Sequence, residues 1–111
     1  MSNFAMVRDI NGYNSFGLPF SEYMYNTTLA SGVAQTLTVP SDYPKWIVVF
    51  GYEVGATVWV AHNATAAIPS VAFAKIVSEV APVARSVKAG DTLSFITPDT
   101  NAQVGVIFYA L

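Results

Sequence analysis

The sequence contains no cysteine, which excludes disulfide bonds, thiolate catalysis and cysteine-ligated zinc sites. It has one histidine, His62, too few for a zinc site built from three or four nitrogen or sulfur ligands. Five Lys and Arg residues are also too few to form a wide phosphate-binding surface. We therefore expect no metal, no cofactor and no nucleic-acid partner.

Long continuous hydrophobic runs are also absent. Residues 54–74 are uncharged and long enough to span a membrane, but Gly55, Asn63 and Pro69 interrupt them and polar residues alternate with apolar ones. The first nine residues show no basic region followed by an apolar run, so no signal peptide is predicted. We expect no membrane partner.

Charge is scarce as well: Asp, Glu, Lys and Arg make up 11% of the 111 residues, against 53% hydrophobic residues. This composition excludes a disordered chain and fits one domain with a real core. Monomeric domains usually carry about twice this share of charge. The shortage indicates a surface partly covered by a permanent or repeated partner, the alternative being a free domain with a Ser, Thr, Asn and Tyr surface.

Turn signals recur every 8–12 residues between short runs of β-forming residues, which predicts an all-β fold. Residues 1–18 show no sustained period and are predicted to be an extended N-terminal arm. Residues 19–111 are predicted to form a single β-sandwich of about eight strands, jelly-roll-like rather than immunoglobulin-like because the Cys…Trp…Cys pattern is missing. The predicted strands are 20–29, 33–39, 46–50, 56–62, 71–80, 83–87, 93–96 and 103–111.

Two of these strands are apolar on both faces, 46–50 and 104–111, and are therefore predicted to be central and covered. Residues 71–80 are ambiguous because their apolar side chains fit both a helical and a strand spacing. A strand is favoured there, since every neighbouring segment reads as strand.

The sequence offers little for catalysis. His62 has no Gly-x-Ser-x-Gly element to partner it, and both glycine-rich phosphate fingerprints are missing. The carboxylates are dispersed, several of them at turns, and lack calcium-loop spacing. They are Asp9, Glu22, Asp42, Glu53, Glu79, Asp91 and Asp99. We predict no catalytic residue and no enzymatic activity.

The aromatic residues are a better lead. One group near the start of the sandwich is predicted to form a protein interface, with core packing as the alternative. It consists of Phe4, Tyr13, Phe16, Phe20, Tyr23 and Tyr25. A second group would suit a sugar-stacking platform, unless its tryptophans lie in the core. It consists of Tyr43, Trp46, Tyr52 and Trp59.

Four segments resemble small virion proteins of tailed phages: 31–40, 46–50, 82–95 and 105–109. Over about residues 19–111 the chain resembles in particular the capsid decoration, or cement, protein of short-tailed enterobacterial phages. The resemblance implies a β-sandwich that staples neighbouring capsid subunits from outside, with no catalytic motif to transfer.

The implied location is the outer capsid surface of the virion, after synthesis in the host cytoplasm. The implied partners are the major capsid protein and further copies of the chain itself, as a dimer or higher oligomer. The alternative is a carbohydrate-binding β-sandwich module of a phage tail or head fibre.

Overall fold

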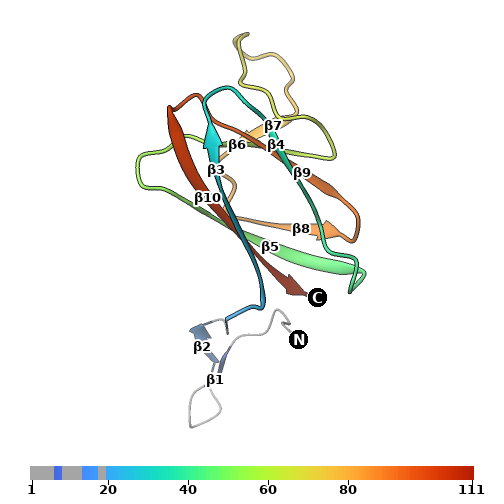
Figure 1. Ribbon diagram of the computed structural model, residues 1–111. Helices are drawn as coiled ribbons and strands as arrows, with labels where there is room; N and C mark the ends of the chain where they lie inside the picture. The colour runs from blue at the N-terminus through green and yellow to red at the C-terminus, as the bar shows by residue number, and fades with distance from the viewer. Residues whose placement is uncertain (1–6, 9–13, 18–19) are drawn as a thin grey trace.

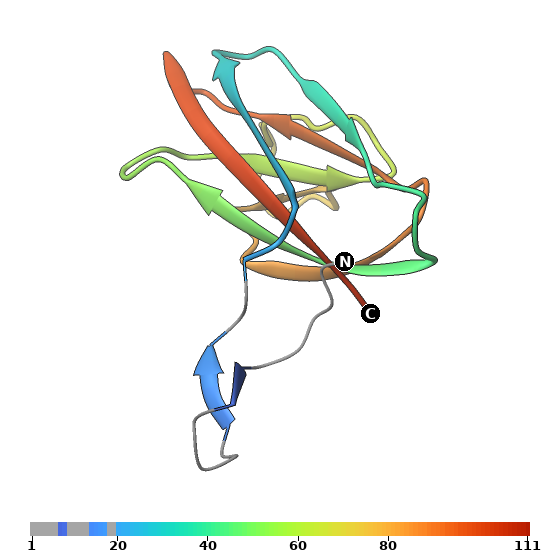
Figure 2. The same cartoon turned by 60° about the horizontal axis from the view of Figure 1, so that its bottom comes forward.

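The computed structural model describes residues 20–111 and the backbone of residues 7–8 and 14–17. Residues 20–111 form two four-stranded antiparallel sheets that pack face to face, with no helix among them (Figures 1 and 2). The first sheet has the order β3 (Tyr23–Ala30), β10 (Asn101–Ala110), β5 (Lys45–Tyr52) and β8 (Ala84–Lys88). The second has the order β4 (Gln35–Thr38), β9 (Thr92–Ile96), β6 (Trp59–His62) and β7 (Ser78–Val80).

The strand pairs are nested along the chain: β3 pairs with β10, β4 with β9, β5 with β8 and β6 with β7. Such nesting is one long hairpin rolled up so that successive pairs fall into alternate sheets, which is the jelly-roll arrangement. The predicted all-β, eight-stranded, jelly-roll-like sandwich is confirmed. The loop between β6 and β7 is the closed end of the rolled hairpin, so it is the turning point of the whole fold.

A further two-stranded antiparallel sheet, β1 (Val7–Arg8) with β2 (Asn14–Gly17), precedes the sandwich. Figures 1 and 2 show it apart from the two larger sheets. This pairing was not predicted, because two residues of β1 are too few to show an alternating pattern. The rest of the predicted arm lies outside the described residues.

The core lies between the two sheets and is supplied by every second residue of the strands. Inward-facing Val48 on β5 and Phe108 on β10 are fully buried, as is Trp46, whose indole N–H donates to the carbonyl oxygen of Pro40 at 2.9 Å. The rings of Tyr23 and Tyr43 meet Trp46 edge-on, at centroid distances of 4.9 and 5.3 Å. Each large buried side chain contributes roughly 1.5–3 kcal/mol.

The two doubly apolar strands occupy the predicted central positions. β10 lies between β3 and β5, and β5 lies between β10 and β8. The residues on their inner faces form the core. The outer face of the first sheet consists of half-buried residues such as Ile47, Val49 and Ile107.

The strand predicted over residues 71–80 is wrong for most of its length. Only Ser78–Val80 form a strand, β7, and residues 71–77 lie in the β6–β7 loop. Their apolar side chains do not mark a buried face, since Val71, Phe73, Ile76 and Val77 are all exposed. Without a face to bury, neither the helical nor the strand spacing carries structural meaning here.

Candidate docking surfaces

The β6–β7 loop, residues 63–77, is the most conspicuous feature of the surface. Its base is anchored to the second sheet by two hydrogen bonds. The backbone N–H of Ala66 donates to Oγ of Ser94 at 2.9 Å, and that of Ala67 donates to Oγ of Ser78 at 3.0 Å. Both serines and Ala66 are buried, so the base of the loop is a fixed part of the fold.

Beyond this anchored base the loop extends away from the sandwich, at the top of Figure 1. We name residues 71–77 the loop tip. The exposed fractions of Val71, Phe73, Ile76 and Val77 are 67%, 108%, 46% and 61%, and Lys75 is the only charged residue among them. Long loops in compact domains commonly carry function, and exposed apolar patches of this kind mark interaction sites.

Phe73 also has a left-handed backbone conformation, with φ at +57°. This region costs a residue with a side chain roughly 1–2 kcal/mol and is populated mainly by glycine. Phe73 therefore combines an unfavourable backbone with a side chain that buries nothing within its own chain. Val54, in the β5–β6 loop, is exposed to a similar extent at 99% but has no such conformation.

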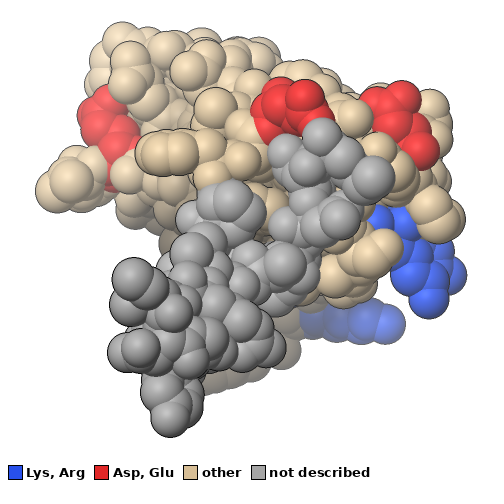
Figure 3. Space-filling view, turned by 90° about the horizontal axis from the view of Figure 1, so that it is seen from below, with Lys and Arg blue, Asp and Glu red and all other residues tan. Residues whose placement is uncertain are grey.

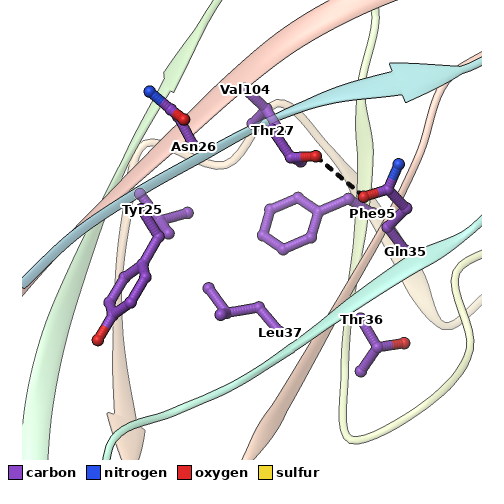
Figure 4. Close-up of a pocket in the computed structure, with 9 residues that line it drawn as sticks. Tyr25, Asn26, Thr27, Gln35, Thr36, Leu37, Phe95 and Val104 are labelled. Carbon is purple, nitrogen blue, oxygen red and sulfur yellow. Dashed lines mark hydrogen bonds between the residues drawn. The ribbon is translucent and has the colours of Figure 1, made fainter.

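A second surface lies where the edges of the two sheets meet, between β3 and β4. A cavity of about 120 Å³ opens there and reaches the core side chains Phe95 and Val104. Figure 4 shows Phe95 at its centre, with Tyr25 and Leu37 towards one side and the Thr27–Gln35 bond on the other. In that bond Oγ1 of Thr27 donates to Oε1 of Gln35 at 3.0 Å.

The opposite side of the sandwich, between β7 and β8, carries charged side chains. Arg85 forms an ion pair with Glu79, and this hydrogen bond raises the pKa of the guanidinium. Both residues also line a cavity of about 150 Å³. Nearby, the Tyr52 hydroxyl donates to the carbonyl oxygen of Pro82 at 2.6 Å, and burial raises the pKa of Tyr52.

Three of the predicted interface aromatics lie in the described part of the chain, each in a different environment. Phe20 is 95% exposed, Tyr23 packs against Trp46, and Tyr25 is partly exposed at the mouth of the β3–β4 cavity. Phe4, Tyr13 and the side chain of Phe16 lie outside the described residues, so the prediction for them stays a prediction.

The predicted sugar-stacking group is divided between two environments. Trp46 is completely buried and contacts Tyr43, whereas Trp59 is half-buried in a separate cluster with Ala61 and Ile96. Trp46 is thus a core residue. Any stacking surface would rest on Trp59, without Trp46.

His62 belongs to a small polar network at one end of the sandwich. Its Nε2 lies 2.8 Å from Oδ2 of Asp91, which also accepts the N–H of Lys88 at 3.0 Å. The hydrogen bond to His62 lowers the pKa of Asp91. Asn63 accepts the N–H of Thr92 at 2.9 Å. These bonds tie the end of β6 to the β8–β9 turn, and no Ser or Thr hydroxyl in residues 20–111 bonds to His62.

On the face seen from below, charged side chains occupy only a few small areas between uncharged residues (Figure 3). In the described part of the chain, no three His, Asp or Glu residues come close enough to hold a metal ion. Nor does any described segment form a helix suited in length and hydropathy to cross a membrane. Comparisons with protein-family models, curated proteins and solved structures gave no match.

Proposed function

We propose that this chain is a non-enzymatic structural protein that binds the outside of an assembled phage capsid and staples neighbouring capsid subunits. The observation that carries the proposal is the loop tip. It presents four exposed apolar side chains on an anchored base, with an aromatic residue held in an unfavourable backbone conformation. Strained residues of this kind persist where surrounding structure fixes them, and they cluster at functional positions.

The loop tip supplies the mode of attachment. Aromatic side chains, phenylalanine among them, are enriched in protein interfaces, where they can enter an apolar pocket of the partner. Because the base of the loop is already hydrogen-bonded, that part of the loop loses no further ordering entropy on binding. The sandwich then acts as a rigid holder for the tip.

The partner we propose is the major capsid protein, as the sequence resemblance implies. Further copies of the chain itself are the second proposed partner. A repetitive shell multiplies a modest contact by valency. Because only the assembled shell offers the complete site, binding stabilises assembled subunits over free ones.

Co-sedimentation with capsids that lack this chain tests the proposal. We expect the wild-type chain to bind them and to raise the temperature at which the shells open. Phe73→Ser should weaken binding, whereas Val54→Ser, at an equally exposed apolar position in another loop, should not. Equal binding by both variants would contradict the assignment of the loop tip, and absence of wild-type binding would contradict the capsid function.

The alternative function is that of a carbohydrate-binding module of a tail or fibre. A glycan array distinguishes it from capsid binding. Retention of a glycan by the wild-type chain, and its loss on Trp59→Ala, would favour that function. The capsid proposal expects no glycan signal from either chain.

A further inference from the structure

The sandwich has two pairs of edge strands, β7 with β8 and β3 with β4, and the two pairs differ in charge. The edge strands β7 and β8 carry Glu79, Arg85 and Lys88, the kind of charged residue that keeps a free strand edge from pairing with another chain. The edge strands β3 and β4 carry no charged residue, and β3 is eight residues long. One side is therefore guarded against an added strand and the other is not.

The free edge of β3 offers a defined set of backbone groups. The carbonyl oxygen of Thr28 points away from β10. This direction follows from its hydrogen bond with the side-chain Nε2 of Gln35 on β4, at 3.2 Å. Gln103, the residue of β10 opposite Thr28, does not bond back to it. The carbonyl oxygen of Gln103 points away from β3 and accepts the N–H of Glu53. Backbone direction alternates along a strand, so the N–H and C=O of Met24 and Asn26 point outward as well.

Within the described residues, no strand pairs with this outer side of β3, and the Gln35 side chain occupies only the carbonyl oxygen of Thr28. Met24 and Asn26 together leave two donors and two acceptors in the spacing that an extended strand would use. Addition of a strand at such an edge is a recurring mode of peptide recognition, in which pockets beside the edge select alternate side chains.

The cavity between β3 and β4 is such a pocket. Its volume is about 120 Å³, and Leu37, Phe95, Val104 and Val106 supply its apolar wall. An apolar cavity of about 150 Å³ stays dry and accepts a ligand the size of benzene, so this one suits a branched aliphatic side chain. Because the cavity is also lined by Tyr25 and Thr27 of β3, a side chain from a strand added beside them can reach it.

We propose that β3 is a strand-addition site that takes an extended, uncharged segment of the capsid partner, with one aliphatic side chain in the β3–β4 cavity. The inference rests on the proposed capsid binding. The absence of charge at the site selects an uncharged segment, since an uncharged edge and an apolar cavity would desolvate a charged segment without offering it a partner.

A second copy of β3 does not fit the cavity in this way. The side chains of β3 on the face of the cavity are Tyr23, Tyr25, Thr27 and Leu29, and all four are already engaged within their own chain. Leu29 is fully buried and Tyr23 packs against Trp46. Tyr25 packs edge-on against Phe108 at a centroid distance of 5.8 Å, and Thr27 bonds to Gln35.

Proline at position 26 tests the site, because it removes an outward N–H and leaves the β10 ladder intact. In capsid co-sedimentation we expect Asn26→Pro to bind at least about tenfold more weakly than wild type. The matched control Asn26→Ala retains the N–H and should bind normally. Thermal melting of both variants verifies that the sandwich is folded. A second variant, Val104→Leu, fills the cavity from within and should reduce binding without lowering the melting temperature.

Amide hydrogen exchange gives a direct readout of the same site. The N–H groups of Met24 and Asn26 should exchange quickly in the free chain and slowly on the capsid. Normal binding by Asn26→Pro and Val104→Leu, with no new protection at β3, would overturn this inference alone. Failure of the wild-type chain to bind capsids would overturn the proposed function and this inference with it. New protection at β3 in the free chain at high concentration, together with dimer formation, would assign the edge to a second copy and refute the proposal.

Discussion

Replacing Phe73 with glycine separates the cost of the loop tip to the fold from its value to binding. Phe73 has φ at +57° and a fully exposed side chain, so its removal loses no packing within the chain. The left-handed conformation costs a residue with a side chain about 1–2 kcal/mol. Replacement by glycine removes this cost, but glycine also makes the unfolded chain more flexible. That second effect destabilises the folded state by about 0.5–1 kcal/mol.

The net effect of Phe73→Gly is therefore a gain of about 0.5–1 kcal/mol in the free energy of unfolding. For a domain of this size that raises the melting temperature by up to about 4 °C. Capsid binding should change in the opposite direction. Loss of an aromatic anchor worth about 1–3 kcal/mol weakens each contact roughly 5- to 150-fold.

Gly90→Ala is the matched control for the backbone term. Gly90 has φ at +82°, and no atom lies within 4 Å of an added Cβ, so only the conformational cost is introduced. Because the unfolded-chain term again offsets part of this cost, Gly90→Ala should lower the free energy of unfolding by about 0.5–1 kcal/mol, the opposite sign to Phe73→Gly, and leave capsid binding unchanged. Calorimetry and co-sedimentation measure both quantities. A melting temperature for Phe73→Gly several degrees below wild type would show that Phe73 stabilises its own fold, and would refute the reasoning.

Three further predictions concern the fold and its arm. Leu29→Ala, at a fully buried position, should lower the free energy of unfolding by about 2–5 kcal/mol in urea titrations, and a change below about 1 kcal/mol would contradict the core assignment. Because the pKa of Asp91 is lowered on folding, its stabilisation is present above its ordinary pKa of 3.8 and is lost as the pH falls through the folded pKa. Asp91→Asn should therefore melt below wild type at pH 5, with the gap closing towards pH 2, and a constant gap would refute the linkage. Deleting residues 1–15 should preserve the melting temperature but reduce capsid occupancy or self-association, whereas a large drop in melting temperature with normal capsid binding would assign the arm to its own core.

The central strands were predictable because apolar residues on both faces leave a direct mark on composition. The runs that became β5 and β10 are apolar at successive positions, with buried residues on the inner face and half-buried ones such as Ile47 and Val49 on the outer face. Turn signals at regular spacing then gave the number of strands. The prediction of a jelly roll also followed, although the strand order itself is a long-range property.

The loop tip was misjudged because local sequence does not show whether an apolar side chain has something to pack against. Val71, Phe73 and Val77 have the composition of a strand, and only the absence of a neighbouring strand in the fold leaves them exposed. The one available hint was that this segment alone fitted two incompatible spacings.

The β3–β4 cavity was likewise beyond prediction. Its lining comes from four strands in two sheets, and its opening depends on how far apart two edges settle. The missing charge on β3 and β4 was visible in the sequence, but it acquires meaning only once both strands are known to be edges.

A reconstruction by electron cryomicroscopy of capsids incubated with the purified chain tests the central claim most directly. We predict density for the sandwich on the outer surface, across the junction between neighbouring capsid subunits, with residues 71–77 directed into the shell. Bare capsids at saturating concentrations of the chain, or bound chains whose loop tip faces solvent, would contradict it.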